Sequence, residues 1–351
     1  MLIRGFWDKL EYPVIALSPM DGVTDAAFRH MICKYSKPAL VMTEFTNVEG
    51  LARGVESMLR AFIYEEAERP VVGQIYGVEL DSFYKCSLML CALGFDGIDI
   101  NMGCPANNVA KRGSGAGLIQ TPELARKIIR SCKKAAHDWS EGVTLEEAGV
   151  AESVINRIAE MNVGREIGRE LLPVSVKTRI GYDNIVVEEW IKNLLEELPA
   201  NISLHGRTLK QMYLGEANWE AIGRAVGVCK GSGVTLLGNG DVKSMEDARA
   251  KISEYGVDGV LVGRAVMGEP WFFGGVEPST LEERVDILLE HSRYFDALGV
   301  GAFYNVKKHL AWYSKGFKGA KETRMELMRS NTLEDVERIC KKIIEQKDDA
   351  Q

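Results

Sequence analysis

The chain has 351 residues, of which 46% are hydrophobic and 26% charged, enough for one large globular domain and an appendage. No apolar run approaches the roughly 18 residues of a membrane span, and residues 1–20 lack the apolar core of a signal peptide, so we expect neither. Seven cysteines without a C-x-x-C pair and five scattered histidines argue against a disulfide framework and against a metal site, and indicate the cytoplasm. The net charge of −7 argues against indiscriminate binding to phosphate polymers.

Eight short apolar segments, each bounded by turn residues, are predicted to be strands. They span residues 14–18, 39–43, 71–76, 96–101, 173–178, 201–205, 234–239 and 258–263. Amphipathic helical patterns lie between most of them, at 24–35, 79–93, 121–136, 186–198 and 244–255, with Thr121 and Ser244 as predicted N-caps. Apolar strands that alternate with helices predict a parallel sheet covered on both faces, and eight such units predict an α/β fold of the (β/α)8 TIM-barrel class.

Every predicted strand ends in a group that can form a hydrogen bond or titrate. Because barrel enzymes build their sites at the carboxyl ends of the strands, these groups are candidate site residues. In chain order they are Pro19-Met20-Asp21, Glu44, Gln74, Asn101 with Cys104, Lys177 with Arg179, His205 with Arg207, Asn239-Gly240-Asp241, and Gly263-Arg264.

Two regions depart from the repeat. About thirty extra residues, near 139–169, predict a surface helix or helix pair inserted beside the barrel. After about residue 278 the strands stop, and three or four helical patterns predict a separate C-terminal bundle. We therefore expect a catalytic barrel over residues 1–275 and a helical domain over residues 279–351. Between Phe303 and Ser330, seven Lys and Arg residues oppose two Glu residues, so this segment can form a basic face for nucleic acid.

Several motifs together are similar to one family, the bacterial tRNA-dihydrouridine synthases. They are "SPMDGVTDAAFR", "TEF", "GQIYG", "DGIDINMGCPANNVAKRGSGAGLI", "VSVKTRIGYD", "LHGRT", "LLGNGDV" and "DGVLVGRAVMGEPW", in order within residues 16–272, followed by "NVKKHLAWYSKG" in the tail. The resemblance implies a flavoenzyme that holds FMN, takes electrons from NADPH and reduces uridine in tRNA. The insertion near 139–169 and Ser18, where many relatives have alanine, depart from the family pattern.

The resemblance makes Cys104 the general acid that protonates C5 of uracil. It implies that the cofactor is held by Pro19, Met20, Asp21, Gln74, Lys177, His205, Asn239, Gly240, Asp241, Gly263 and Arg264. Contacts with substrate or RNA are expected from Asn101, Lys111, Arg112, Arg179, Arg207, Lys307, Lys308 and Lys315. The glycines at 113, 115 and 117 are expected to let the Cys104 loop open and close. In the tail, Lys318, Lys321 and Arg324 are further phosphate-contact candidates, and Trp312 is expected to pack in a core.

Two other classes of function stay open at this point. The barrel could reduce or oxidise a small pyrimidine-like molecule, or the chain could be an RNA-binding protein without activity. If the chain is a dihydrouridine synthase, as the resemblance implies, ribosomal RNA is an alternative substrate to tRNA. The basic tail argues against the first alternative, and the presence of Cys104, Lys177 and Arg264 argues against the second.

Overall fold

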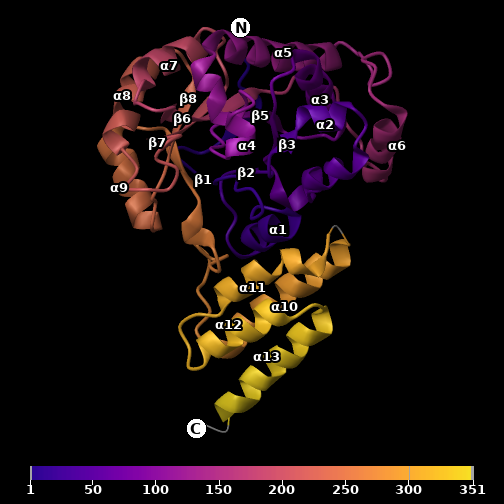
Figure 1. The fold of residues 1–351 in the computed structure, drawn as a ribbon, viewed down its shortest axis with the longest axis vertical. Coiled ribbons are helices and arrows are strands. Elements are labelled where there is room, and N and C mark those ends of the chain that lie inside the picture. Colours follow the sequence, from indigo (N-terminus) through magenta and orange to yellow (C-terminus); the bar gives the residue numbers. More distant parts are fainter. Residues whose placement is uncertain (1, 300, 349–351) are drawn as a thin grey trace.

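The computed structural model describes residues 2–299 and 301–348, and in this part of the chain nine strands form one parallel sheet (Figure 1). Its order is β1-β9-β8-β7-β6-β5-β4-β2, and β3 also pairs with β4. All eight predicted strands are present, although the second is shorter than expected and is followed by the extra strand β3. The strands are β1 (Val14–Leu17), β2 (Val41–Met42), β3 (Thr46–Asn47), β4 (Val71–Tyr76), β5 (Gly97–Met102), β6 (Val174–Gly181), β7 (Asn201–Thr208), β8 (Thr235–Asn239) and β9 (Gly259–Val262).

Backbone hydrogen bonds bring the two ends of the sheet together. The Ala39 amide donates to the Ile15 carbonyl over 3.0 Å, and the Leu17 amide donates to the Leu40 carbonyl over 3.3 Å. These bonds join β1 to the segment that leads into β2, so the sheet closes into a barrel. The predicted TIM-barrel class is confirmed.

Helices surround the barrel and continue beyond it. Ser244 accepts a hydrogen bond from the Asp247 amide, as its predicted N-cap role requires. Thr121 also lies at the predicted N-cap position, directly before Pro122, although its side chain makes no capping bond. The pattern at 219–229 was not predicted as a helix, and its two internal glycines weaken its helix propensity. The helices are α1 (Ala26–Tyr35), α2 (Val48–Ala52), α3 (Leu80–Ala92), α4 (Asn107–Ala110), α5 (Pro122–Ser140), α6 (Glu152–Met161), α7 (Val187–Leu195), α8 (Trp219–Cys229), α9 (Met245–Tyr255), α10 (Leu281–Leu298), α11 (Lys307–Tyr313), α12 (Ala320–Arg329) and α13 (Leu333–Asp348).

The insertion after α5 contains the single helix α6, at the edge of the barrel in Figure 1. Val154 and Ile158 are buried on its inner face. The Asn162 side chain donates to the carbonyl of Ala92 at the end of α3 over 2.8 Å, and Trp139 Nε1 donates to the Gly168 carbonyl over 3.2 Å. These contacts fold the extra residues back onto the barrel wall.

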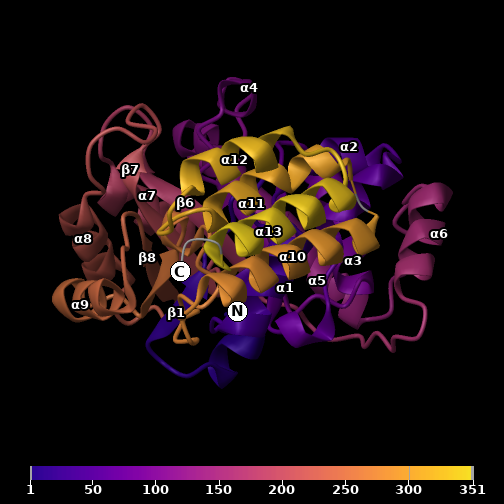
Figure 2. The same cartoon turned by 90° about the horizontal axis from the view of Figure 1, so that it is seen from below.

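Among the described residues, α10 to α13 form a four-helix bundle under the barrel (Figures 1 and 2). Its core includes Leu288, Leu310 and Val336, together with Ala27 and Met31 from α1 of the barrel. The bundle therefore docks on α1 and shares a hydrophobic core with it. None of the helices in the described part of the chain combines the length and apolar character needed to cross a membrane.

Candidate active site

A cavity of about 1590 Å³ opens at the carboxyl ends of the barrel strands. Ligand pockets for small molecules are usually about 300–1000 Å³, so this one has room for a nucleotide-sized cofactor and a second ligand. Its lining contains most of the predicted strand-end residues. These are Pro19, Met20, Asp21, Asn101, Cys104, Lys177, Arg179, His205, Arg207, Asn239, Gly240, Asp241, Gly263 and Arg264.

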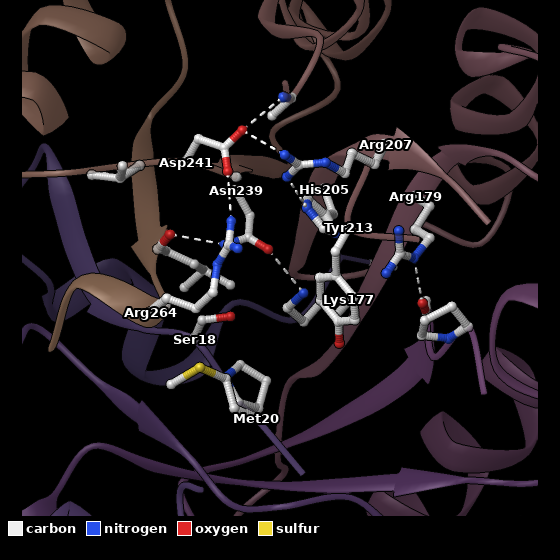
Figure 3. A pocket seen from close by; sticks show the side chains of 18 of the residues that line it. Ser18, Met20, Lys177, Arg179, His205, Arg207, Tyr213, Asn239, Asp241 and Arg264 are labelled. Atoms are coloured by element: carbon white, nitrogen blue, oxygen red, sulfur yellow. Dashed lines mark hydrogen bonds and ion pairs between the residues drawn. The ribbon is translucent and has the colours of Figure 1, made fainter. Parts of the chain in front are cut away.

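Asp241, directly after β8, joins two guanidinium groups (Figure 3). Its carboxylate accepts from Arg207 Nη2 and from Arg264 Nη2, each over 2.7 Å, and from the Ala217 amide over 2.8 Å. Burial acts to raise the pKa of Asp241, but the hydrogen bonds from Arg207 and Ala217 outweigh it and hold the pKa below its usual range. Asp241 has a φ of +52°, which a non-glycine residue adopts only when its surroundings enforce it. These bonds supply that enforcement, and they keep the largely exposed Arg264 at the cavity edge.

Lys177 and His205 lie on neighbouring strands and face the cavity (Figure 3). Lys177 Nζ donates to Asn239 Oδ1 over 3.1 Å, and Asn239 Nδ2 donates to the Leu261 carbonyl over 2.9 Å. Burial, followed by the nearby charge of Arg179, lowers the pKa of Lys177 to about 8. Burial and the surrounding cations lower the pKa of His205 well below its ordinary value, so its imidazole is neutral at pH 7. The cavity wall is thus cationic and suited to an anionic ligand.

Cys104 lies in the loop after β5, with 8% of its surface exposed. Its amide donates to Asn101 Oδ1 over 2.8 Å, and Arg179 Nε donates to the Gly103 carbonyl over 2.6 Å, so the loop is held from two sides. Burial is the largest influence on the thiol and raises the pKa of Cys104. The thiol is therefore protonated at neutral pH and can donate a proton into the cavity.

Two of the three glycines after Cys104, Gly115 and Gly117, lie where a side chain would clash with the backbone. Gly115 has a φ of +56°, and a Cβ there would lie 2.9 Å from the Cys104 carbonyl oxygen. A Cβ on Gly117 would lie 2.7 Å from the Ala110 carbonyl oxygen. Both glycines are buried, so in this structure they allow tight packing behind Cys104.

Four predicted residues of the barrel lie outside the cavity lining. Gln74 is fully buried below it and contacts Asn101, while Lys111 and Arg112 are exposed on the turn after α4. Glu44 is half-buried, and burial, then the charges of Asp25 and Asp21, raise its pKa to about 7. The lining also contains residues that the sequence did not single out, such as Trp219, whose Nε1 donates to the Gly240 carbonyl over 3.0 Å. No strand-end pattern marks Trp219, because it begins the helix that the sequence analysis missed.

Most predicted cations of the tail have partners within the chain. Lys307 donates to Asn331 Oδ1 over 3.0 Å, Lys315 pairs with Glu269 over 2.5 Å, and Arg324 donates to the Ser314 carbonyl over 2.9 Å. Lys308 Nζ lies over Gly22 in the loop that leads from β1 to α1, where it interacts with the Asp21 and Asp25 carboxylates. Lys318 and Lys321 are exposed. Trp312 is half-buried and packs against the barrel core, as expected.

Sequence comparison decides the family. The dihydrouridine synthase (Dus) family model matches residues 16–148 and 145–348. The chain belongs to the dihydrouridine synthase family. It is 33% identical over 341 residues to a probable tRNA-dihydrouridine synthase of Staphylococcus aureus, covering 94% of this chain and 93% of the relative. It is 31% identical over 345 residues to probable tRNA-dihydrouridine synthase 2 of Bacillus subtilis, covering 95% of each. The family makes the protein an oxidoreductase, and the resemblance found in the sequence is confirmed.

Two solved structures are similar at lower levels. A variant of NCR from Zymomonas mobilis matches 73% of this chain and 83% of its own, with a TM-score of 0.41 and 17% identity. DHODH from Eimeria tenella, in complex with ferulenol, matches 81% of this chain and 82% of its own, with a TM-score of 0.48 and 14% identity. Both TM-scores are below 0.5, so the family assignment rests on the family model and on the sequence relatives.

Proposed function

We propose that the protein reduces the C5–C6 double bond of uridine in tRNA, in the cytoplasm, with FMN as cofactor and NADPH as the source of electrons. The observation that carries this proposal is the protonated thiol of Cys104 in the wall of a large cationic cavity at the barrel mouth. The names of the Staphylococcus aureus and Bacillus subtilis relatives support tRNA as the substrate.

The volume of the cavity and the amide and cationic donors in its wall support flavin mononucleotide as its ligand. Gly240 has a φ of +127°, and a Cβ there would lie 2.6 Å from Ala217 Cβ and 3.1 Å from the His205 ring, so glycine lets this part of the cavity wall pack closely beside His205. The phosphate and ribityl chain would be held by Asn239, Gly240, Asp241, Gly263 and Arg264. The ring would be held by Pro19, Met20, Asp21, Gln74, Lys177 and His205. When bound and reduced by NADPH, FMN supplies a hydride for C6 of the uracil ring.

The remaining chemistry belongs to side chains of the protein. Saturating the double bond requires a proton at C5 in addition to the hydride at C6, and the Cys104 thiol donates it and becomes a thiolate. Lys177 and Arg179 lie close enough to influence the Cys104 pKa, and their positive charges stabilise the thiolate as it forms. Asn101, Arg179 and Arg207 would orient the uracil, and a solvent proton restores the thiol before the next turnover.

A uridine within folded RNA must leave its stack to enter this cavity. The exposed Lys111 and Arg112 would contact the backbone beside the extruded base, and the tail would bind more distant phosphates. Within the tail, Lys307, Lys308 and Lys315 would have to exchange their internal partners for phosphate. In this proposal residues 1–275 form the catalytic barrel, with the insertion near 139–169, and residues 279–351 form the RNA-binding domain.

The replacement Cys104→Ala tests the proposal, with the half-buried Cys33→Ala as a matched control. The variants are purified, their FMN content is measured, and tRNA, ribosomal RNA and free uridine are each supplied with NADPH. We expect Cys104→Ala to retain FMN and to lose dihydrouridine formation in tRNA by roughly 100-fold or more, the usual contribution of a general acid, while Cys33→Ala stays active. Full activity of Cys104→Ala would show that the proton has another source. Activity of the parent only on free uridine or ribosomal RNA would contradict the tRNA assignment.

A further inference from the structure

Asp99 is a carboxylate inside the barrel, below the cavity, with no exposed surface. It lies on β5, between Gln74 of β4 and Ser175 of β6 in the sheet register. Burial raises the pKa of Asp99 to about 6, against the opposing hydrogen bonds from Gln74 and Ser175 and the charge of Lys177. Asp99 is therefore mainly ionised at neutral pH. A fully buried charge is costly, and Asp99 does not line the cavity, so its presence calls for a function.

A continuous chain of hydrogen bonds runs from Asp99 to the Cys104 loop. Gln74 Nε2 donates to Asp99 Oδ2 over 2.7 Å, and Asn101 Nδ2 donates to Gln74 Oε1 over 3.1 Å. Asn101 Oδ1 then accepts from the Gly103 amide over 3.0 Å and from the Cys104 amide over 2.8 Å. The other Asp99 oxygen accepts from Ser175 Oγ over 2.8 Å. We call Asp99, Gln74 and Asn101 the relay.

The carboxylate determines the direction of every bond in the relay. An ionised Asp only accepts hydrogen bonds, so Gln74 must turn its NH₂ group toward Asp99 and its oxygen toward Asn101. Asn101 must then turn its own NH₂ group toward Gln74, which leaves its oxygen for the two loop amides. If Gln74 were reversed, Asn101 would be driven to reverse as well, and its NH₂ group would face the Gly103 and Cys104 amides, two donors that it cannot satisfy.

We propose that Asp99 is a positioning residue that fixes the amide orientations of Gln74 and Asn101 and thereby holds the Cys104 loop at the reacting position. This inference rests on the proposed function in assigning Cys104 a role in uridine reduction. Arg179 anchors the Gly103 carbonyl independently of Asp99, so loss of the relay loosens the loop without freeing it completely.

Two substitutions at Asp99 separate orientation from charge. Asp99→Leu removes both acceptor oxygens, so nothing fixes the orientation of the Gln74 and Asn101 amide groups. Asp99→Asn keeps an acceptor for Gln74, and its NH₂ group can donate to Ser175 Oγ, whose hydroxyl is then released to donate to the Ile98 carbonyl at 3.2 Å. Asn201→Leu is the matched control, since Asn201 is equally buried inside the barrel but bonds to the Thr235 carbonyl and Ser203 Oγ, outside the relay.

The first measurement is the rate of iodoacetamide alkylation at Cys104 in the FMN-loaded enzyme, followed by peptide mass spectrometry. This measurement does not depend on which substrate is reduced. With two loop amides released, we expect Asp99→Leu to be alkylated about tenfold faster than the parent. Asp99→Asn and Asn201→Leu should stay within about twofold of it. Equal alkylation rates in Asp99→Leu and Asn201→Leu would overturn the proposal.

The second measurement is the single-turnover rate at which the reduced enzyme forms dihydrouridine in tRNA. We expect Asp99→Leu to lower it roughly 10- to 100-fold, as loss of an orienting group usually does, and Asp99→Asn to restore most of it. Equal losses in Asp99→Leu and Asn201→Leu, or no rescue by Asp99→Asn, would assign Asp99 to stability alone. If the parent fails to reduce tRNA, the proposed function fails, while the alkylation contrast still decides whether Asp99 positions Cys104.

Discussion

Replacing Lys177 with methionine is expected to stabilise the flavin-free protein while removing a residue that the proposed function requires. Lys177 is held in the cavity wall with a pKa of about 8, lowered by burial and by Arg179. Its charge is therefore unfavourable in the folded state at neutral pH. A methionine of similar length would remove that charge, so Lys177→Met should have a larger free energy of unfolding than the parent.

The expected stabilisation of Lys177→Met follows from the lowered pKa of Lys177. The drop from 10.5 to about 8 corresponds to roughly 3 kcal/mol, at about 1.4 kcal/mol for each pH unit. The variant loses the Lys177 hydrogen bond to Asn239, which contributes about 1 kcal/mol. Solvent also reaches the half-buried side chain through the cavity mouth and weakens the penalty. We therefore expect a net stabilisation of about 1–2 kcal/mol.

The pH dependence has a definite sign. Below pH 8 Lys177 is protonated in both the folded and unfolded states, so the whole penalty is present. Between pH 8 and 10.5 the unfolded chain retains a proton that the folded protein has released, so the parent gains stability relative to Lys177→Met as the pH rises. Above 10.5 the advantage of the variant should vanish.

Urea unfolding of the flavin-free proteins at several pH values, followed by tryptophan fluorescence, measures this difference. Lys177→Arg is the control, because arginine keeps its charge and should be less stable than the parent above pH 8. A Lys177→Met variant that is less stable than the parent at pH 7, or a difference that does not shrink between pH 8 and 10.5, would refute the reasoning.

Three further predictions concern stability, cofactor and RNA. Arg29 and Glu68 form a fully buried ion pair with 2.6 Å between Nε and Oε2, so Arg29→Met should leave the Glu68 charge unpaired and lower the free energy of unfolding in urea by about 3–5 kcal/mol. Adding Glu68→Gln should recover part of this loss, and a loss below about 1 kcal/mol in Arg29→Met would contradict the prediction. Gly240→Ala should weaken FMN binding at least about tenfold in a fluorescence titration, because its Cβ would clash with Ala217 and crowd the His205 ring at a φ that alanine rarely adopts. Gly227→Ala, with open space around its Cβ position, should bind FMN normally. The double reversal Lys318→Glu and Lys321→Glu should reduce by about two the slope of the logarithm of the tRNA binding constant against the logarithm of the salt concentration. The same reversal at the exposed Lys127 and Lys230 of the barrel should leave that slope unchanged, and equal effects would place the RNA elsewhere.

The barrel could be predicted because its evidence is periodic. Each buried strand is a short apolar run, and eight such runs alternate with amphipathic helices, which leaves few other architectures. The residues that follow the runs then share one face, and the cavity lining includes most of them. The helix at Trp219–Cys229 was missed because Gly223 and Gly227 weaken its local signal, while packing of Ile222 and Ala225 against the core stabilises it.

Asp99 could have been found from the same pattern. It lies two residues before Asn101 on one strand, and side chains two apart point to the same face of a sheet. Since Asn101 was placed at the cavity, Asp99 had to point into the barrel below it. The hydrogen bonds of the relay could not be predicted in this way, because they depend on the register of β4 against β5, which the sequence of either strand does not fix.

The number of cations in the basic tail does not predict how many of them are available to bind RNA. Seven cations between Phe303 and Ser330 do gather in one segment, but folding brings the carboxylates of other elements to them. Lys315 meets Glu269 after β9, and Lys308 meets Asp21 and Asp25 beside β1. The contact of Lys308 places the bundle directly against the loop that would support the flavin ring. RNA phosphates that drew Lys308 away would leave Asp21 and Asp25 with less positive charge, so RNA binding at the bundle would change the electrostatics of the cavity edge.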